Sequence, residues 1–400
     1  MKTVGIVAEY NPFHEGHKYH IAEAKRVSQA DKAVVIMSGS FVQRGEPACA
    51  DKFVRAGWAI SGGADMVIEL PEVFSLACAE RFAGGAVRIL AGLGIIDALC
   101  FGSESGDIEA LAALAEGEFD EEAFIEAMSE GRSYASALGK ATGTPPSPND
   151  ILGIEYVRAV KKYAPDMEVY SVKRMGSGYS EGELSSGYSS AKAIRNALSN
   201  YNGYIKMSGA AFEELSRALP REVLNDISQM MKDGSFPATA EELSHGILYK
   251  FRSMSAEEIA QLPETAEGLE NLFKKYALTS SELYELLENV KSKRYTMARL
   301  KRTAMCALLG IDKRLQDEAA NSREALYARV LAVKKESQEL LSMLGSAAIP
   351  VVVQSSDREA LPALALKIEQ KAALAHRVRA LGQPYDKSVI EDASHRLIVR

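Results

Sequence analysis

The chain opens with a short apolar stretch, Thr3-Val4-Gly5-Ile6-Val7-Ala8, followed directly by Glu9-Tyr10-Asn11-Pro12-Phe13-His14-Glu15-Gly16-His17. The first stretch has the length and the branched side chains of a buried β-strand. Residues 16–29 form a segment of helix length. The polar junction therefore lies where a strand ends and a helix begins. In an open α/β sheet, ligands bind at this edge, outside the carboxyl ends of the strands.

The same alternation continues along the first half of the chain. Apolar runs of strand length occupy residues 32–37, 65–70, 97–102 and 168–173, and helix-length segments occupy residues 50–61, 76–92 and 151–162. Strands separated by helices predict right-handed crossovers and a parallel sheet with helices on both faces. The expected fold class is α/β, with a Rossmann-like domain over residues 1–200.

After residue 200 the pattern becomes mainly helical. Helix-length segments follow one another from residue 210 to residue 309, and strand-like runs return at residues 326–333, 349–354 and 397–400. We expect a second region, residues 201–400, that is mostly helical and ends in a small α+β unit.

Composition limits the class of protein. The 400 residues are 47% hydrophobic and 25% charged, which is typical of a soluble globular protein with two or three domains. There is no apolar run of about 18 residues that would span a membrane, and the first apolar stretch is too short for a signal peptide. Four cysteines without a close pair favour neither a disulfide framework nor a cysteine zinc site. We expect a cytoplasmic protein with no membrane partner, in which Cys49 and Cys100 are core residues.

The charge is distributed unevenly. The net charge is −7, yet residues 291–400 hold 20 lysines and arginines against 12 acidic residues, which leaves −15 on residues 1–290. A local positive field favours a nucleic-acid partner even on an acidic chain. A lysine-rich, solvated helix face explains the same surplus equally well.

His14 and His17 are the residues in which we expect the chemistry. They are three apart at a helix start, so they share one side of its first turn. The unpaired N–H groups and the dipole of a helix start suit a phosphate, and Gly16 lets it approach the backbone. Two imidazoles at this position can donate hydrogen bonds to a triphosphate and stabilise a leaving pyrophosphate.

Three other interpretations compete with phosphate chemistry. The pair resembles half of a zinc site, for which His20 is the nearby additional ligand. A helix start without any role is the second alternative. A dinucleotide site is the third, but neither G-x-G-x-x-G nor G-x-x-x-x-G-K-[ST] follows a strand.

The order strand, His-x-Gly-His, helix resembles the HIGH-motif nucleotidyltransferase superfamily. Residues 188–195, Tyr-Ser-Ser-Ala-Lys-Ala-Ile-Arg, resemble the I-S-S-T-x-I-R element that closes the nucleotide site there, with Tyr188 in place of Ile and Ala191 in place of Thr. The resemblance implies phosphate contacts from Ser189, Ser190 and Arg195. Two serines before a helix are also an ordinary helix cap.

Longer stretches resemble a narrower family, the bacterial tRNA(Met) cytidine acetate ligases. They are residues 9–17, 37–47, 63–71, 100–104, 147–156, 173–179 and 295–302. The resemblance implies that ATP and acetate give acetyl-adenylate, and that acetyl then passes to N4 of the wobble cytidine of elongator tRNA(Met). The alternatives are an adenylyltransferase that makes a dinucleotide-type cofactor from ATP and a phosphorylated small molecule, and an RNA-binding protein without activity.

The resemblance also implies which residues bind ATP. His14 and His17 are the catalytic candidates, and the ATP-binding candidates are Val7, Ala8, Glu9, Tyr10, Asn11, Pro12, Phe13, Glu15, Gly16, Lys18, Tyr19, His20, Gly102, Asn149 and Arg174. Considered alone, Gly102 would be a turn residue, Asn149 a helix cap and Arg174 a solvated strand end. We expect no resident protein metal site, but Mg²⁺ bound to ATP, with Glu69 and Glu104 as candidate ligands through water.

The base must reach this site, so the tRNA has to be held by cations. The candidates are Lys293, Arg294, Arg299 and Arg302, at the start of a predicted helix. Lys371, Arg377 and Arg379 are expected to extend this basic surface. Phosphate contacts of this kind do not select a sequence, so additional contacts to unpaired bases are needed.

Overall fold

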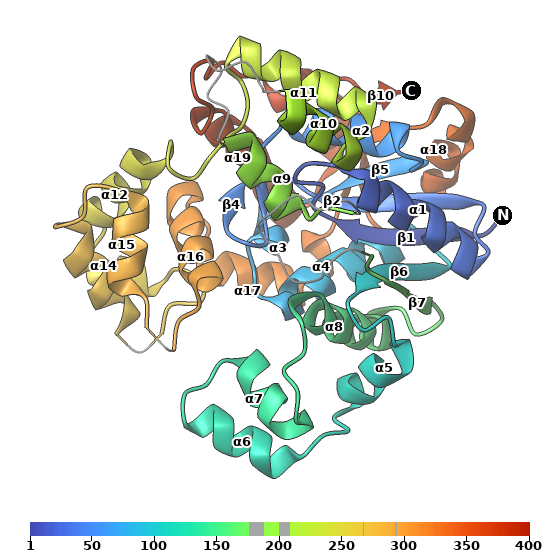
Figure 1. Ribbon diagram of the computed structural model, residues 1–400. Coiled ribbons are helices and arrows are strands. Elements are labelled where there is room, and N and C mark those ends of the chain that lie inside the picture. Colours follow the sequence, from blue (N-terminus) through green and yellow to red (C-terminus); the bar gives the residue numbers. More distant parts are fainter. Residues whose placement is uncertain (176–187, 200–208, 267, 293) are drawn as a thin grey trace.

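The computed structural model describes residues 1–175, 188–199, 209–266, 268–292 and 294–400 (Figure 1). A sheet of eight strands forms the centre of this described part, in the order β10-β8-β5-β2-β1-β6-β7, with β9 paired to β8. The strands are β1 (Thr3–Ala8), β2 (Lys32–Ser38), β5 (Met66–Leu70), β6 (Ala98–Ser103), β7 (Glu168–Lys173), β8 (Ala328–Val333), β9 (Val351–Val352) and β10 (Ile398–Val399). A small antiparallel pair, β3 (Phe41–Val42) and β4 (Glu46–Pro47), stands apart from the sheet.

The five strands expected in the first half are confirmed to within one residue at either end. They pair in parallel throughout, β1 with β2 and β6, β2 with β5, and β6 with β7. Along β2, Val34 and Ile36 belong to one buried cluster, and Val35 and Met37 belong to another. Because alternate side chains point to opposite faces, both faces of the sheet are covered.

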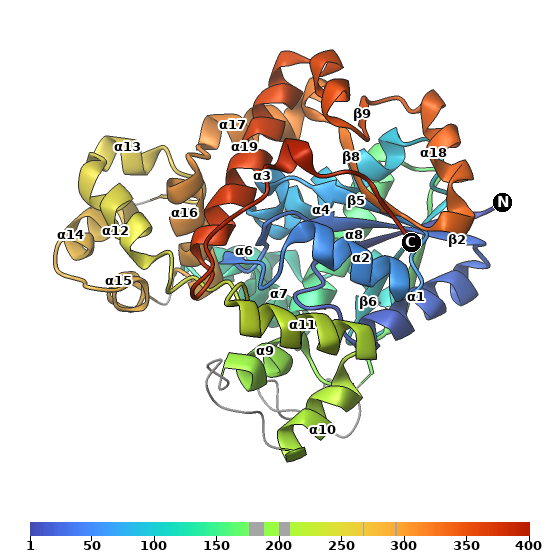
Figure 2. The same cartoon turned by 90° about the horizontal axis from the view of Figure 1, so that it is seen from above.

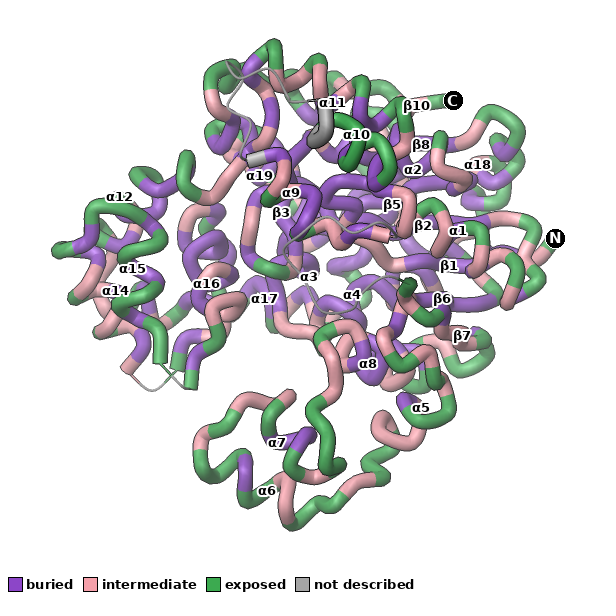
Figure 3. Tube along the Cα trace, in the orientation of Figure 1, coloured by how far each residue is buried: buried purple, intermediate pink, exposed green. Residues whose placement is uncertain are grey.

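Helices of the first half supply both covers. The described helices of this half are α1 (Glu15–Ser28), α2 (Lys52–Ser61), α3 (Glu72–Ser75), α4 (Ala79–Gly92), α5 (Ile108–Glu116), α6 (Glu121–Ser129), α7 (Tyr134–Thr142), α8 (Pro148–Tyr163) and α9 (Ala191–Ser199). Apolar side chains of α4 and α8 share a cluster with Val34, whereas those of α1 and α2 share a cluster with Val35. Figure 3 shows that α6 and α7 project away from the sheet; α6 is mostly exposed, whereas the centre of α7 is buried.

The second half is mainly helical, as expected. Its helices are α10 (Gly209–Ala218), α11 (Arg221–Asp233), α12 (Ser244–Ser253), α13 (Ala256–Ala260), α14 (Leu269–Ala277), α15 (Leu283–Val290), α16 (Met297–Leu309), α17 (Lys313–Asn321), α18 (Glu339–Met343) and α19 (Ala363–Leu381), with short 3₁₀ turns η1 (Arg323–Ala325), η2 (Lys335–Ser337), η3 (Leu344–Ser346), η4 (Ser355–Ala360) and η5 (Asp392–Ser394). Helices α12 to α16 form a lobe to one side of the sheet, around a hydrophobic cluster that includes Phe251 and Phe273 (Figures 1 and 2).

The expectation of a separate α+β unit at the end of the chain is wrong. Its strands exist, but β8 pairs antiparallel with β5, and β9 and β10 both pair with β8. All six residues of β8 are buried. Two-residue strands such as β9 and β10 have too few partners to form a sheet alone, so they extend the existing edge. The division of the chain at residue 200 remains a prediction.

The topology locates the ligand edge. The chain proceeds from β1 to β2 and β5 on one side, then returns to β6 and β7 on the other. The direction of winding therefore reverses between β1 and β6, and ligands of open α/β sheets bind at such a switch point. In the described residues, no helix combines the length and apolar character needed to cross a membrane.

Candidate active site

The loop after β1 is held firmly at both sides. Tyr10 has φ +47°, in the left-handed region that a non-glycine residue adopts only when its surroundings enforce it. The side-chain oxygen of Asn11 accepts a hydrogen bond from the Cys49 N–H at 2.8 Å, and the Asn11 carbonyl accepts one from Arg195 at 2.7 Å. The predicted ATP-binding residues 7–20 therefore comprise the end of β1, this loop and the first half of α1.

His14 and His17 cap helix α1 with their own rings. His14 is the N-cap residue, and its Nδ1 accepts a hydrogen bond from the Gly16 N–H at 3.1 Å. The Nδ1 of His17 accepts one from the His14 N–H at 3.3 Å. The two rings stack with centroids 3.6 Å apart. Because each Nδ1 is an acceptor, each neutral ring carries its proton on Nε2 and offers that N–H to a ligand.

The environment keeps these rings neutral. Burial, followed by the positive charge of Arg174, lowers the pKa of His14 to about 3 and that of His20 to about 4. Burial, His14 and Arg174 hold the pKa of His17 well below its ordinary value. At pH 7 the site therefore presents neutral N–H donors beside one guanidinium.

Glycine at position 16 protects the arrangement of the two rings. A Cβ at this position would lie 2.9 Å from Cε1 of His14. The sequence suggested that Gly16 leaves room for a phosphate, and the structure adds that it leaves room for the His14 ring. Below the rings, buried Phe13 and Tyr10 meet edge to face at 4.9 Å, and Tyr10 lies 4.8 Å from the His17 ring.

Glu104, at the end of β6, connects two of the predicted nucleotide contacts. Its Oε1 accepts a hydrogen bond from Asn149 Nδ2 at 2.5 Å and lies 3.3 Å from Arg174 Nε. Asn149 lies in the first turn of α8, and Arg174 follows β7. One carboxylate therefore orients an amide and a guanidinium that are 25 residues apart in the chain.

Gly102 lies inside strand β6, so its interpretation as a turn residue is wrong. It pairs with Val172 of β7. A Cβ on Gly102 would lie 3.3 Å from Cγ of Arg174. This glycine therefore makes space for the Arg174 side chain as it passes the end of the sheet.

The second predicted phosphate element lies beside the first. The Ser190 hydroxyl accepts a hydrogen bond from the Ala193 N–H at 3.1 Å, which makes it a cap of α9. The ring of Tyr188 lies 5.4 Å from that of Tyr19 on α1. Ser189 and Ser190 are therefore close to the histidine turn, and Arg195 reaches back to the loop at Asn11. Residues 176–187, which include part of the predicted stretch 173–179, lie outside the described residues.

Arg55 on α2 is a functional support that sequence reasoning missed. It is fully buried and donates hydrogen bonds to the carbonyl oxygens of Glu9, Ser38 and Ala50, at 2.7 to 3.1 Å, and to that of Gly39. Glu9 follows β1, Ser38 ends β2, Gly39 follows it, and Ala50 lies just before α2. The one signal was an arginine inside the apolar segment Phe53-Val54-Arg55-Ala56-Gly57-Trp58.

Comparisons with known proteins agree with this geometry. A family model described as HIGH Nucleotidyl Transferase matches residues 1–388. A tRNA(Met) cytidine acetate ligase of Acetivibrio thermocellus is 36% identical over 389 residues, which cover 92% of this chain and 92% of the relative. A protein of the same name from Thermosipho africanus is 36% identical over 375 residues, 89% of this chain and 85% of the relative. This chain belongs to the tRNA(Met) cytidine acetate ligase family.

Solved structures also match over the whole length. The crystal structure of Thermotoga maritima TmcAL bound with alpha-thio ATP has a TM-score of 0.87 and 30% identity, and the match covers 100% of both chains. The apo crystal structure of the same protein has a TM-score of 0.88. The expected family and the expected HIGH-type α/β fold are therefore confirmed.

Neither carboxylate considered for Mg²⁺ is free in this member of the acetate ligase family. Glu69 is 2% exposed and pairs with the buried ammonium of Lys52 at 2.7 Å. Glu104 is engaged by Asn149 and by the Ser147 hydroxyl. Within the described part of the chain, His14, His17 and His20 do not bring three ligand atoms within 4.8 Å of one another, so the zinc half-site interpretation gains no support.

The cations predicted to hold tRNA are not equally placed. Arg294 is exposed, and Lys293 lies outside the described residues. The guanidinium of Arg299 donates to the Glu264 carbonyl oxygen at 2.8 Å and lies 4.9 Å from the Tyr295 ring centre. Arg302 is 7% exposed and pairs with both carboxylate oxygens of Glu264. This placement counts against an RNA contact from Arg302.

The expected basic extension toward the C-terminus is partly wrong. Arg379 is 3% exposed and faces Asp51, so it is not a surface cation. Lys371 is half-buried and donates to the Leu309 carbonyl at 3.0 Å, while Arg377 pairs with Glu391 on the surface. Arg379 of α19 faces Asp51 at the start of α2, a contact between distant segments that the sequence does not reveal.

A large cleft opens between the two halves of this acetate ligase family member. Its volume is about 1150 Å³, and most of its lining residues come from α4 and α8, the start of α7 and the start of α16. Figure 1 labels these four helices. Among the described residues, eight arginines and lysines line it against three glutamates. Gln43 lines the cleft, and its N–H donates to the Glu9 carboxylate of the β1 loop at 2.8 Å. The cleft is therefore basic and begins beside the candidate active site.

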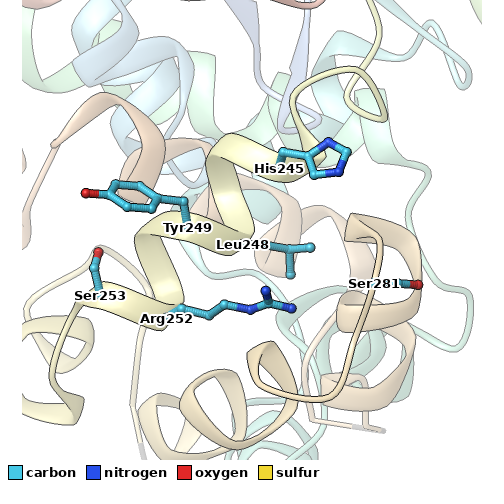
Figure 4. A pocket seen from close by; sticks show the side chains of 6 residues that line it. All are labelled: His245, Leu248, Tyr249, Arg252, Ser253 and Ser281. Carbon is cyan, nitrogen blue, oxygen red and sulfur yellow. The ribbon is translucent and has the colours of Figure 1, made fainter.

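A second pocket, of about 610 Å³, lies on the helical lobe. Figure 4 shows its six lining residues, which come from α12 and from the turn before α15. Arg252 there donates to the carbonyl oxygens of Ala277 and Ser280, at 2.8 and 2.9 Å, which is a structural role. None of the predicted site residues lines this pocket.

Proposed function

We propose that this chain activates acetate with ATP and transfers the acetyl group to N4 of the wobble cytidine of elongator tRNA(Met), which gives N4-acetylcytidine. The observation that carries the proposal is the pair of stacked imidazoles at the start of α1. Their Nδ1 atoms are held by backbone N–H groups, so both Nε2–H groups remain for a ligand. This pair lies at the β1–β6 switch point of a chain whose relatives are named tRNA(Met) cytidine acetate ligase.

ATP is proposed to bind with its phosphates over the first turn of α1 and its nucleoside toward the end of β6. The helix start offers N–H donors and a positive dipole end. Arg174 supplies a full positive charge, and its ion pair with Glu104 orients the guanidinium. Asn149, held by the same carboxylate, offers an amide to the base or the ribose. The structurally similar Thermotoga maritima protein was crystallised with alpha-thio ATP, which supports ATP as the nucleotide.

In the first step, an acetate oxygen attacks the α-phosphorus of ATP. The bond from that phosphorus to the oxygen bridging it to the β-phosphate breaks, and pyrophosphate leaves. Negative charge grows on the leaving group, and the two Nε2–H donors stabilise it without a rearrangement of the site. Neutral imidazoles suit this task because their protons stay on the enzyme at pH 7.

In the second step, the cytidine N4 attacks the carbonyl carbon of acetyl-adenylate. The bond to the AMP oxygen breaks, AMP leaves with the electron pair, and the nitrogen loses a proton. Neither step needs a covalent enzyme intermediate. Burial raises the pKa of Cys49 to about 11 and that of Cys100 to about 12, so both thiols stay protonated, as expected for core residues.

Mg²⁺ is proposed to enter with ATP, as a counter-charge to its phosphates. Because Glu69 and Glu104 are both engaged, the ion would take its ligands from phosphate oxygens and water, which suits its chemistry. The protein's own contribution to phosphate binding then comes from histidines, backbone N–H groups and arginine.

The basic cleft is the proposed path of the RNA. Its exposed cations come from both walls, Lys162 from α8 and Arg294 from the segment before α16. A groove of this charge attracts phosphates, and its end at Gln43 brings an unpaired loop to the β1 turn. The wobble cytidine of an anticodon loop is an unpaired base that such a groove can deliver.

The proposal is tested by mass spectrometry of tRNA nucleosides after incubation with ATP and isotopically labelled acetate. The expected product is labelled N4-acetylcytidine, with pyrophosphate released only when acetate is present. Pyrophosphate release that needs a phosphorylated small molecule instead of acetate would establish the rival adenylyltransferase. Absence of release with either acceptor, from a folded protein that binds tRNA, would establish an RNA-binding protein without activity.

A further inference from the structure

Three side chains from distant parts of the chain meet behind the active-site loop. Asp51 is the N-cap of α2, His376 lies in α19, and His395 follows η5 near the C-terminus. One ligand atom from each lies within 4.8 Å of the other two. Across the residues that the structure describes, this is the one group of three histidine, cysteine or carboxylate side chains with that geometry.

One ring nitrogen of His376 is buried without a hydrogen bond. Its side chain is completely buried, and its Nε2 lies 3.0 Å from the Ile390 carbonyl oxygen. A carbonyl only accepts, so Nε2 carries a proton, and in the neutral ring Nδ1 presents a lone pair. Nδ1 is buried and makes no hydrogen bond, and Oδ2 of Asp51 lies 3.4 Å from it. A ring nitrogen and a carboxylate oxygen that face each other at this distance are stabilised by a cation between them, either a proton or a metal ion.

The spacing suits a small metal ion. Two ligands of a tetrahedral Zn²⁺ ion, with bonds of about 2.0–2.1 Å, lie about 3.3 Å apart. The separation of Nδ1 and Oδ2 is 3.4 Å. Metal-binding histidines commonly donate their other N–H to a carbonyl, as His376 does to Ile390. The His395 ring stacks on Phe53 at 3.8 Å, which fixes its plane.

We propose that Asp51, His376 and His395 bind one Zn²⁺ ion, with water in the remaining position. Two imidazoles and one carboxylate suit zinc, whereas Mg²⁺ prefers oxygen ligands alone. The ion would join α2, α19 and the C-terminal segment, so its role is structural. Arg379 lies 3.9 Å from the same Asp51 oxygen and partly neutralises it. We therefore expect weaker binding than in a zinc site with four protein ligands.

The test measures metal content of the full-length protein. The protein is stripped with a chelator, incubated with zinc chloride, desalted and assayed by mass spectrometry of the metal. The expected result is one zinc per chain, and cobalt chloride in its place is expected to give the visible absorption of a tetrahedral site. Zinc is also expected to raise the thermal unfolding midpoint by several degrees.

Matched variants locate the ion. Asp51→Asn keeps an N-cap for α2 but removes the charged ligand, and His395→Ala removes a ligand from a partly exposed position. Both are expected to lose the zinc and its thermal effect. His245→Ala, at an exposed histidine of the helical lobe, and His17→Ala, in the nucleotide site, are expected to keep it.

Two results would overturn the assignment. One is wild-type protein that retains well under half an equivalent of zinc. The other is zinc that stays in folded Asp51→Asn and His395→Ala but disappears in His17→Ala, because the ion would then belong to the nucleotide histidines. The measurement is separate from catalysis, so a failure of the proposed ligase activity leaves its outcome readable.

Discussion

At the scale of single residues, His14 has two roles, and a different substitution can remove each of them. Its Nδ1 caps the helix, and its Nε2–H is free for a phosphate. Asn at this position keeps a cap oxygen near Nδ1 but lacks the outer donor. We expect His14→Asn to fold normally and to raise the barrier to acetyl-adenylate formation by about 2–4 kcal/mol.

His14→Gln is the complementary variant, because it keeps an N–H near Nε2 and loses the cap. We expect it to retain more activity and less stability than His14→Asn. Acetate-dependent pyrophosphate release gives the rates, and urea unfolding gives the stabilities. Equal rates for His14→Asn and the wild type would remove this histidine from the chemistry.

The neutral state of His14 also predicts a pH dependence of folding. Burial lowers its pKa from 6.5 to about 3 in the folded protein, so below pH 6.5 the unfolded chain binds more protons. This contribution to stability is complete above pH 6.5 and is lost as the pH falls toward 3. The expected loss is about 1.4 kcal/mol per pH unit. Urea unfolding between pH 7 and pH 4.5 measures it, and His14→Asn is expected to show a shallower dependence.

The sequence located the histidines but not their supports, and the reason is separation along the chain. His14, Gly16 and His17 interact within one turn, so their spacing reveals their geometry. Glu104 joins Asn149 and Arg174 across gaps of 45 and 70 residues. No local pattern marks such a pairing, and Glu104 was therefore taken for a magnesium ligand.

At the scale of elements, Glu104 connects β6, α8 and β7, and its loss is expected to affect nucleotide binding. In Glu104→Gln the side chain still accepts from Asn149 but no longer holds Arg174 by charge. We expect a rise of about two- to fivefold in KM for ATP, since a partly exposed ion pair contributes about 0.2–1 kcal/mol. Steady-state pyrophosphate release measures it. An unchanged KM in a folded variant would show that Arg174 is positioned without Glu104.

Arg55 joins the ends of β1 and β2 to α2. Arg55→Met would remove the guanidinium donor from the carbonyls of Glu9, Ser38 and Ala50, which lie in buried or half-buried positions. We expect a loss of about 3 kcal/mol or more in the free energy of unfolding, because each unsatisfied buried group costs about 1–3 kcal/mol. Arg26→Met is the control, since that guanidinium is exposed and pairs with Glu23 on the surface. Similar losses in both variants would contradict the role of Arg55.

The strands, like the site residues, could be predicted from the sequence where their pattern is local and not where it depends on distant segments. β1, β2, β5, β6 and β7 are buried apolar runs separated by helices, and this local pattern gave their positions and parallel order. β8 is an equally clear run, but it follows β7 by 155 residues. Its antiparallel pairing with β5 depends on where the helical half returns the chain. That return is a property of tertiary packing, so the sequence suggested a separate unit instead.

At the scale of the whole molecule, the positive surplus of residues 291–400 overstates the basic surface. In this region, Arg329 and Arg302 are buried and Arg358 is half-buried, and they pair with Asp392, Glu264 and Glu369, respectively. The cleft gains its charge from both halves instead, with Lys162 on one wall and Arg294 on the other. Counting charges along a chain therefore does not locate the basic surface.

This cleft carries the last prediction, the separation of tRNA binding from acetate activation. Lys162→Ala combined with Arg294→Ala is expected to weaken tRNA binding by roughly tenfold or more and to lower its salt dependence by about one phosphate contact for each residue. Acetyl-adenylate formation is expected to stay unchanged, because neither residue belongs to the histidine turn or the Glu104 group. Lys161→Ala is the control, since this neighbouring exposed lysine pairs with Glu116 and does not line the cleft. Filter binding over a range of salt concentrations measures the affinity. Equal weakening by Lys161→Ala, or unaltered affinity in the double variant, would place the RNA on another face of the protein.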